Sequence, residues 1–462
     1  MSALLYNVSD AMKRNLRNRW KLGKEEFNTQ YFDVAKDEHL LVREGLYQYD
    51  IHDLVRKYGS PLEIVFPFIV EKRVRKLIDI FNAYIKLNDY KGRFFYHYPM
   101  KVNQGKEFVL PLVSEGANLE TSSANELWLV KRMWEGDNFA SRIRVLCNGP
   151  KTERYLKLID ELDRKDLIIT PIIEEERELA FFRRYKGEVG VRVNLDVKVK
   201  SHWDKRFNYF GFPEDGVLSM GKIRNLAVLS YHISSQIQKI EGFTAPIRRA
   251  LALYAKMREK NTGLDTINIG GGGGVPYEKR RFYSGKAAIQ KIVDTFKKEC
   301  RKLGVREPNI ICEWGRYVVA PAQMSVFRVL TEKVVKNGGT KRWYVIDGSF
   351  INDLADTWAI HQKWHVVPVN EMGGRVQQVW LAGSSCDSDD KYTAGGSHVI
   401  LPKVEEGDEL YMAVLDTGAY QDSLASYHCL LAHPTKLVAQ DGTVAVARKR
   451  ETPEEIGKKF GW

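Results

Sequence analysis

The sequence is poor in cysteine and lacks a CxxC pair. Its five cysteines, an odd number, are spread over 462 residues. Domains that depend on disulfides carry cysteine at much higher density, and cysteine-rich zinc sites use closely spaced pairs. His361 and His365 have the spacing of helical metal ligands, but no HExxH motif surrounds them. We therefore expect neither a disulfide framework nor a metal site. The cysteines are Cys147, Cys300, Cys312, Cys386 and Cys429.

Long apolar runs are absent as well. No stretch approaches the roughly 18 apolar residues that a membrane span needs. The first residues, MSALLYNVSDAMKRNLRNRW, lack the continuous apolar segment of a signal peptide. We therefore expect no membrane association, and the sparse cysteines fit a reducing cytoplasm best.

Acidic residues are too few to balance the basic ones. The chain carries 71 Lys and Arg against 59 Asp and Glu, a formal net charge of +12. Such an excess would suit a nucleic acid, an anionic lipid or a phosphorylated small molecule. The basic residues are spread along the chain and usually stand beside acids, as in VEKRVRKLID, which is typical of solvated helix faces. We therefore expect no nucleic-acid partner.

No Pro/Ser-rich linker, low-complexity tract or fixed-period repeat divides the chain, so the order of secondary-structure signals must define the domains. From residue 94 to residue 320, eight apolar or β-branched runs alternate with amphipathic, helix-like stretches such as 285–304. Eight buried strands, each followed by a helix, predict a (β/α)₈ barrel of roughly 250 residues. The runs lie at 93–101, 117–123, 143–149, 167–173, 189–195, 226–233, 266–274 and 309–319.

The pattern changes after about Ala322. Strand-like runs then follow one another without comparable helices between them, which predicts a second, mostly antiparallel β domain. The segment 31–45 could add strands to it. The expected fold is therefore α/β, with the barrel in residues 70–325 and the β domain in residues 1–69 and 326–462.

Five consecutive glycines, Gly270 to Gly274, follow the seventh predicted strand. A backbone without side chains can approach a phosphate closely and offer it several N–H donors. A flexible turn is the alternative, but barrels commonly bind phosphate at this strand end. We therefore predict a phosphate site, with Arg316 as its charged partner.

Lys101 ends the first barrel strand, in YHYPMKVNQ. A lysine held among apolar residues loses proton affinity and becomes a usable nucleophile, whereas an ordinary surface lysine does not. An amine, a phosphate cradle and a carboxylate such as Glu313 at one barrel rim are what pyridoxal 5′-phosphate requires. The sequence therefore predicts this cofactor.

Several motifs, in the same order, resemble those of the fold type III pyridoxal phosphate decarboxylases. They include GRFFYHYPMKVNQ, SYHISSQ, GGGGGVPYE, CEWGRYVVAPA, SSCDSDD and GAYQDSLASYH, and the resemblance runs from about Tyr47 to Pro434. That family joins an alanine racemase-like barrel to a β domain and acts on basic amino acids. Within it the motifs are most similar to those of arginine decarboxylases. The resemblance implies decarboxylation of L-arginine to agmatine and carbon dioxide, a step toward polyamines such as spermidine.

The resemblance also implies roles for residues of the barrel. Lys101 would bind the cofactor covalently, His232 would stack on its ring, and Glu313 would hydrogen-bond the pyridine nitrogen. The other residues expected around the cofactor are Glu120, Glu126, Ser235, Gly272, Gly273, Gly274, Arg316 and Tyr420.

The β domain would supply the groups that act on the substrate. Cys386 matches the cysteine that protonates Cα, and Asp387 matches the acid that binds the distal cation of the substrate. Asp389 and Asp390 add negative charge beside it. Because the stretch IDGSFINDL also resembles diaminopimelate and ornithine decarboxylases, further candidates for reading the substrate are Asp347, Asp353 and Asp356.

Two alternatives stay open. The same chemistry could act on ornithine, lysine, meso-diaminopimelate or carboxynorspermidine, or the chain could be a non-catalytic homologue that binds the cofactor. Family members commonly build each active site across a dimer interface. The resemblance therefore implies a homodimer with shared active sites.

Overall fold

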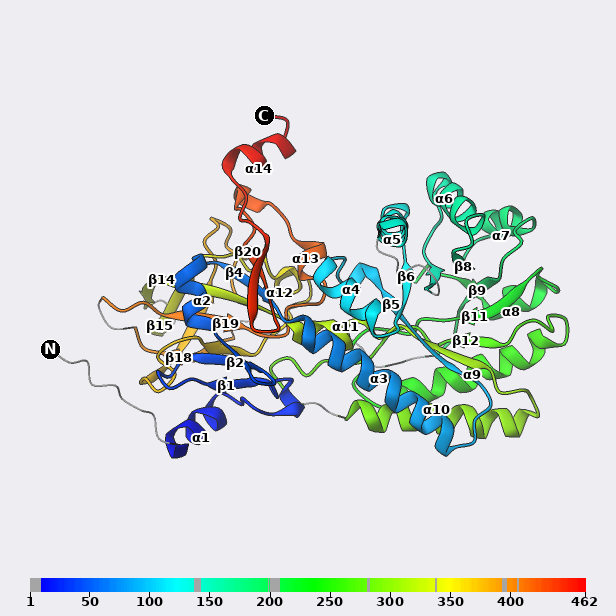
Figure 1. Cartoon of the computed structure of the whole chain (residues 1–462), viewed down its shortest axis with the longest axis horizontal. Coiled ribbons are helices and arrows are strands. Elements are labelled where there is room, and N and C mark those ends of the chain that lie inside the picture. Colours follow the sequence, from blue (N-terminus) through cyan, green and yellow to red (C-terminus); the bar gives the residue numbers. More distant parts are fainter. Residues whose placement is uncertain are drawn as a thin grey trace. The chain divides into compact units, whose positions relative to one another are not determined.

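The chain forms two compact units in the computed structural model (Figure 1). Unit 1 comprises Met1–Val70, Val275–Arg281 and Val319–Trp462, and unit 2 comprises Glu71–Gly274 and Phe282–Val318. The expected boundary at residue 325 falls inside β14 (Gln323–Val335), a strand that pairs with β4 (Leu62–Val65) of unit 1, so the barrel unit ends earlier in the chain. The structure describes residues 10–136, 143–197, 199, 208–280, 283–336, 339–392, 397–404 and 407–462.

Unit 2 is a closed barrel of eight parallel strands. Each strand pairs with the next around the barrel. The ring is closed by the pairing of β13 (Asn309–Cys312) with β5 (Phe94–Pro99) and of β8 (Ile168–Ile173) with β9 (Val189–Asn194). A short strand, β10 (Phe212–Pro213), pairs in parallel with β9. The eight predicted strands are confirmed. They are β5 (Phe94–Pro99), β6 (Asn118–Thr121), β7 (Arg144–Cys147), β8 (Ile168–Ile173), β9 (Val189–Asn194), β11 (Leu226–Ser230), β12 (Thr266–Asn268) and β13 (Asn309–Cys312).

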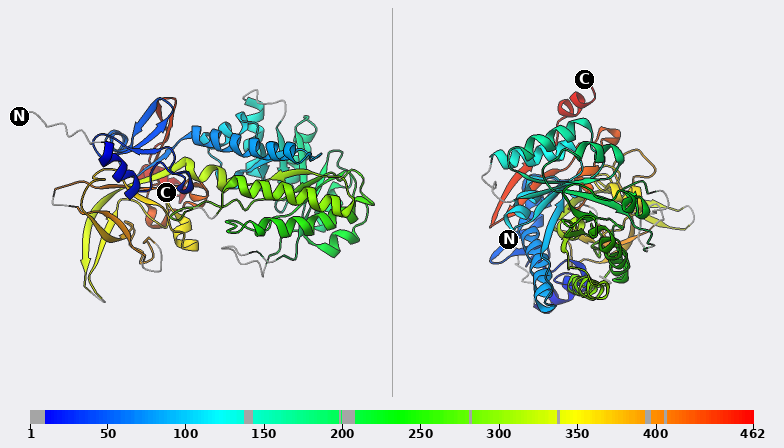
Figure 2. Two further views of the ribbon diagram at one scale, coloured as in Figure 1. Left: turned by 90° about the horizontal axis from the view of Figure 1, so that it is seen from below. Right: turned by 90° about the vertical axis from the view of Figure 1, so that its right-hand side faces the viewer.

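Helices follow the strands and cover the barrel. In α10 (Gly285–Leu303) the Ser284 side chain accepts a hydrogen bond from the amide of Ala287, and Gly304 ends the helix at φ +64°. Figure 2 shows α10 beside α9 (Glu241–Arg258), as their contacts require. The remaining helices are α3 (Pro67–Leu87), α4 (Lys106–Ser114), α5 (Ala124–Gly136), α6 (Glu153–Asp163), α7 (Glu176–Phe182), α8 (Glu214–Ser219) and α11 (Gly315–Val319).

Apolar side chains fill the inside of the barrel. A buried cluster joins Leu146, Ile172, Val228 and Ile311, with Phe95 packed against it. A packed interior leaves no channel, so polar chemistry is confined to the ends of the strands.

Unit 1 is built on β strands. β1 (Phe32–Val34), β2 (Leu40–Glu44) and β3 (Tyr47–Asp50) form a small antiparallel sheet, so the segment 31–45 does supply strands. The large sheet is antiparallel except for the pairs β4–β20 and β15–β17, which confirms the predicted second domain. Its strands are β4 (Leu62–Val65), β14 (Gln323–Val335), β15 (Lys341–Ile346), β16 (Val366–Pro368), β17 (Val376–Ala382), β18 (Val399–Pro402), β19 (Tyr411–Val414), β20 (Thr435–Gln440) and β21 (Thr443–Arg448).

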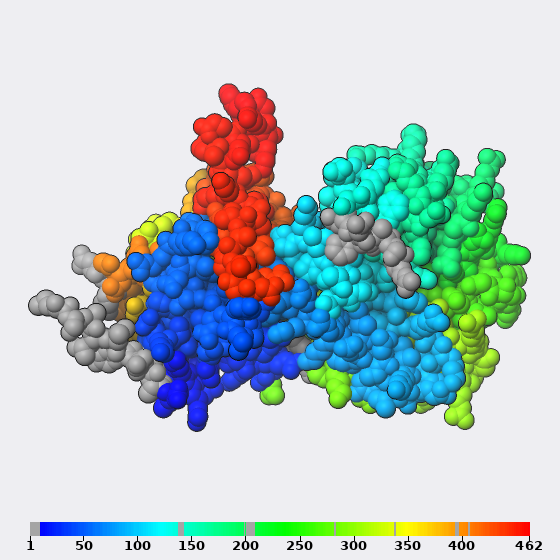
Figure 3. Space-filling view, viewed as in Figure 1, coloured from blue at the N-terminus to red at the C-terminus, as the bar shows by residue number. Residues whose placement is uncertain are grey.

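Short helices complete unit 1. The C-terminal helix α14 (Pro453–Lys459) begins with a capping box between Thr452 and Glu455. Its red segment stands out from the surface of unit 1 in Figure 3. No described helix is long and apolar enough to cross a bilayer. The other helices are α1 (Asp10–Arg19), α2 (Ile51–Tyr58), α12 (Ala355–Ile360) and α13 (Gln421–Leu424).

Candidate active site

Lys101 lies in a 3₁₀ turn, η2 (Met100–Val102), directly after β5. Its neighbours Met100 and Val102 are buried, but the Lys101 side chain is exposed. The apolar surroundings expected for Lys101 are therefore not found. The strand that carries the lysine is buried, whereas its amine projects from the strand end.

Glu120 is fully buried at the end of β6. One of its oxygens accepts a hydrogen bond of 2.8 Å from the Ser122 hydroxyl, and the other has no hydrogen-bond partner among the described residues. Burial and the nearby negative charge of Glu313 raise the pKa of Glu120 to about 8, although the positive charge of Lys101 opposes this. Glu120 is therefore mostly protonated at pH 7.

Glu313 directly follows β13 and is held by two amide side chains. Its Oε1 accepts hydrogen bonds of 2.6 Å from Asn268 and 3.2 Å from Asn148. These residues lie at the ends of β12 and β7, so three strand ends fix one carboxylate. The role of Asn268 is not evident from the sequence, where it is only a polar residue at the end of an apolar run.

The glycine run is packed too closely for side chains. A Cβ on Gly270, where φ is +64°, would lie 2.6 Å from the carbonyl oxygen of Tyr231. A Cβ on Gly273 would lie 2.7 Å from the ring of Trp314. The glycines therefore allow this backbone to lie against the neighbouring strand ends.

The same run presents three consecutive amides. Gly272 accepts a hydrogen bond of 3.0 Å from the amide of Ile237, but none of the described residues accepts one from the amides of Gly272, Gly273 or Gly274. Gly272 and Gly273 are buried. Because buried N–H groups are costly without an acceptor, this cradle fits an anion such as the phosphate of pyridoxal phosphate.

The loop after β11 lies along the glycine run. His232 Nδ1 accepts a hydrogen bond of 3.0 Å from the amide of Gly271, which places the ring proton on Nε2. The Ile237 amide bond to Gly272 continues this contact. Ser235, which is partly exposed, lies between these two anchor points.

Arg316 is buried near the turn that carries Lys101. It follows Gly315, where a Cβ would lie 2.7 Å from both Pro99 and Val102. The absence of a side chain at Gly315 therefore lets α11 pack directly on that turn. The predicted residues of unit 2 lie at the strand ends or in the turns and helices that follow them; they are Lys101, Glu120, Glu126, His232, Ser235, Gly272, Gly273, Gly274, Glu313 and Arg316.

In unit 1, the exposed Cys386 lies in a loop that Asp390 anchors. Asp390 is 3% exposed; its Oδ1 accepts a hydrogen bond of 2.7 Å from the amide of Phe350, and its Oδ2 accepts one of 3.1 Å from the amide of Ser385. Asp390 therefore ties this loop to the segment after β15 and does not face the solvent.

Asp387 and Asp389 are the acids of this loop that reach the solvent. Their side chains are 36% and 59% exposed, and Asp387 Oδ2 lies 3.1 Å from His428 Nε2. Asp347 instead accepts hydrogen bonds from the Ser60 hydroxyl and the Arg328 amide. Buried elsewhere in unit 1 are Asp353 and Asp356.

Tyr420 also belongs to unit 1, whereas the other residues expected around the cofactor belong to unit 2. It precedes α13 at φ +70°, and its carbonyl accepts a hydrogen bond of 2.9 Å from the amide of Leu424. His365 is buried, with Nε2 3.0 Å from the carbonyl oxygen of Trp20. In the described part of the chain, no three His, Cys, Asp or Glu side chains are placed to hold a metal ion.

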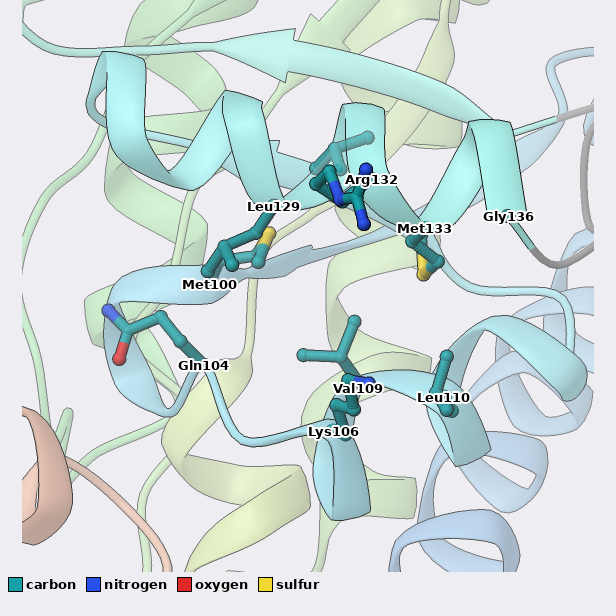
Figure 4. Close-up of a pocket in the computed structure, with 10 residues that line it drawn as sticks. Met100, Gln104, Lys106, Val109, Leu110, Leu129, Arg132, Met133 and Gly136 are labelled. Atoms are coloured by element: carbon teal, nitrogen blue, oxygen red, sulfur yellow. The ribbon is translucent and has the colours of Figure 1, made fainter.

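A separate cavity of about 270 Å³ lies between α4 and α5 (Figure 4). Its lining is mainly apolar, and Lys106 and Arg132 also contribute to it. None of the predicted site residues lines this cavity. The apolar residues that do are Met100, Val109, Leu110, Leu129, Val130 and Met133.

The curated proteins that are similar to this chain include arginine decarboxylases and diaminopimelate decarboxylases. A biosynthetic arginine decarboxylase of Bacteroides thetaiotaomicron is 27% identical over 68% of this chain and 56% of its own. The chain thus spans little more than half the length of that relative. A diaminopimelate decarboxylase of Methanocaldococcus jannaschii is 26% identical over 88% of this chain and 92% of its own.

Solved structures share the two-domain fold. A biosynthetic arginine decarboxylase from Campylobacter jejuni has a TM-score of 0.82 at 19% identity and covers 95% of this chain and 92% of its own. The M. jannaschii diaminopimelate decarboxylase has a TM-score of 0.80 at 23% identity and covers 94% and 98%. Residues 76–320 match the family model described as "Pyridoxal-dependent decarboxylase, pyridoxal binding domain". Because this match covers more than half of the sequence, the chain belongs to the pyridoxal-dependent decarboxylases, and its cofactor is pyridoxal phosphate.

Proposed function

We propose that this chain is an enzyme that decarboxylates L-arginine to agmatine and carbon dioxide. The observation that carries the proposal is the set of groups at the barrel end: an exposed amine, Lys101, near a protonated Glu120 and a clamped Glu313. When bound, pyridoxal phosphate supplies an electron sink for the electron pair left at Cα as carbon dioxide departs.

Each group at the barrel end suits one part of that cofactor. Lys101 binds it covalently, and Glu313 holds a proton at the pyridine nitrogen while Asn268 and Asn148 fix the carboxylate. The amides of the glycine run, the guanidinium of Arg316 and the hydroxyl of Ser235 would bind the phosphate. His232 packs on the face of the ring.

Glu120 serves the site best in its neutral form. A second ionised carboxyl group beside Glu313 would be repelled, and burial and this charge raise the pKa of Glu120, which favours the protonated acid. Glu120 can then donate a hydrogen bond near Lys101 without adding negative charge.

The exposed acids of unit 1 suit a cationic substrate. Asp387 and Asp389 can form charge-assisted hydrogen bonds with a guanidinium, whose planar donors match carboxylates. Cys386 returns the proton to Cα. Its hydrogen bond to Cys429 raises the pKa of the Cys386 thiol, which keeps that proton in place at neutral pH.

The same chemistry on ornithine, lysine, meso-diaminopimelate or carboxynorspermidine is the second candidate. The diaminopimelate decarboxylase of M. jannaschii, which aligns over 92% of its length, favours it. However, meso-diaminopimelate carries a carboxylate at its distal end, which the acids at 387 and 389 would repel. Arginine has no such group, so these acids favour it over meso-diaminopimelate.

Release of carbon dioxide, measured side by side on arginine and the other four compounds, tests the proposal. We expect arginine to be turned over fastest. Lys101→Ala should abolish both turnover and the visible absorption of the bound cofactor, whereas Lys106→Ala, on the exposed start of α4, should keep both. Retention of both by Lys101→Ala would refute the assignment. Cofactor binding without release from any compound would identify a non-catalytic homologue.

A further inference from the structure

Two exposed thiols meet in unit 1. Cys386 Sγ lies 3.6 Å from Cys429 Sγ, although the two residues are 43 positions apart. The other cysteines, Cys147, Cys300 and Cys312, are buried. A disulfide needs a separation of about 2.05 Å, so the two sulfur atoms must approach by roughly 1.5 Å, which side-chain rotation can supply.

One short segment, 349–353, holds both thiols in place. Asp390 accepts hydrogen bonds from the amides of Phe350 and Ser385, and these bonds fix the loop of Cys386. Asn352, which is 1% exposed, accepts a hydrogen bond of 3.0 Å from the His428 amide and donates one of 2.9 Å to the His428 carbonyl. The hydrogen bonds to Asp390 and to His428 are thus made by residues of the same short segment, Phe350 and Asn352. The two sulfur atoms are therefore held close together before any disulfide forms.

The backbone at Cys429 is strained. Cys429 and Leu430 have φ values of +55° and +51°, which residues with a side chain rarely adopt. The contact between His428 and Asp387 joins the same two loops a second time, next to both thiols. Cys429 therefore lies in a strained turn that the contacts of its neighbours hold in place, as is typical of functional positions.

We propose that Cys386 and Cys429 form a reversible intramolecular disulfide that withdraws Cys386 from the reaction. The inhibitory part of this inference rests on the proposed role of Cys386 as proton donor. Where thiols are normally kept reduced, the disulfides that do form are usually transient and redox-sensing. Peroxide would then inhibit decarboxylation by causing this bond to form.

Hydrogen peroxide is the oxidant. Because the contact with Cys429 raises the pKa of the Cys386 thiol, the thiolate of Cys429 attacks a peroxide oxygen first; the O–O bond breaks, and a sulfenic acid at Cys429 and hydroxide result. The second thiolate attacks the sulfenic sulfur, so that the S–S bond forms as the S–O bond breaks and a second hydroxide leaves. The two hydroxides take up the two thiol protons. Two thiols thus lose two electrons, one peroxide becomes two water molecules, and a dithiol reverses the step by becoming a disulfide itself.

The test treats the full-length, cofactor-loaded protein with stoichiometric peroxide. Intact mass under non-reducing conditions should fall by about 2 Da, and peptide mapping should find one crosslink between positions 386 and 429. Carbon dioxide release should fall in parallel by about 100-fold, the usual contribution of a general acid. Dithiothreitol should restore both the mass and the activity.

Cys429→Ser is the informative variant, because it keeps Cys386 but cannot form the bond. It should retain its activity after peroxide, whereas Cys300→Ser, altered at a buried cysteine, should respond like the wild type. Oxidised wild type without the crosslink, or with the crosslink and undiminished release, would overturn the proposal. Failure of the proposed function is distinct: the reduced protein would then release no carbon dioxide from any basic amino acid, while the mass still reports the crosslink.

Discussion

Glu120 carries a proton at neutral pH because burial and the charge of Glu313 disfavour its ionised form. The unfolded chain ionises this acid near its ordinary pKa of 4.5, whereas the folded chain does so at about 8. Between these values the native state binds the extra proton. Folding stability therefore falls as pH rises through this window, by at most about 1.4 kcal/mol per pH unit for one group.

Glu120→Gln should remove this dependence, because an amide resembles the neutral acid and does not titrate. In the cofactor-free protein, the free energy of unfolding of the variant relative to wild type should be higher at pH 8 than at pH 5. Glu188→Gln, at an exposed position, should show no such difference. Urea denaturation at both pH values measures it. An equal effect of Glu120→Gln at the two pH values would contradict this account of the carboxyl group.

At the scale of elements, the backbone of the glycine run lies so close to neighbouring residues that no side chain would fit there. Gly273→Ala would place a methyl group 2.7 Å from the rigid Trp314 ring. We expect a loss of about 1–3 kcal/mol of stability and weaker binding of pyridoxal phosphate, because the amides of the cradle must move. Gly457→Ala is the control, since its Cβ meets only Trp462 at an ordinary 3.5 Å. Spectroscopic titration of the cofactor-free protein should separate the two variants.

The buried acid Asp390 anchors the loop of Cys386. Asp390→Ala would deprive the amides of Phe350 and Ser385 of their acceptor, so denaturation should show a loss of about 3 kcal/mol. Asp389→Ala should cost less than about 1 kcal/mol, because its exposed carboxylate lies 3.6 Å from Lys391. Equal losses in the two variants would show that Asp390 does not anchor the loop.

The barrel strands were predictable because buried parallel strands have short, nearly continuous apolar runs. The glycine run was recognisable because it directly follows one of these runs. The hydrogen bonds that hold Glu313 could not be predicted from the sequence, because Asn148 and Asn268 come together only when the barrel closes. The contact between the two thiols likewise depends on tertiary structure, because no local pattern links positions 386 and 429. Lys101 is exposed, contrary to expectation, because it lies in the turn after the buried strand β5 and not in the strand itself.

At the scale of the whole molecule, we propose that two copies of the chain share their active sites. Lys101→Ala and Cys386→Ala would each inactivate the protein alone. Random pairing of the two variants would make half of the dimers mixed. Each mixed dimer would have one intact site if sites are shared, so about a quarter of wild-type activity should return. No recovery in a verified mixed dimer would show that each site uses a single chain.

Carbon dioxide release from L-arginine by the reduced, cofactor-loaded protein tests the central claim most directly. The account predicts release with formation of agmatine, faster than from ornithine, lysine, meso-diaminopimelate or carboxynorspermidine. Faster release from meso-diaminopimelate would contradict the assignment of arginine, and no release from any of the five compounds would contradict decarboxylation itself.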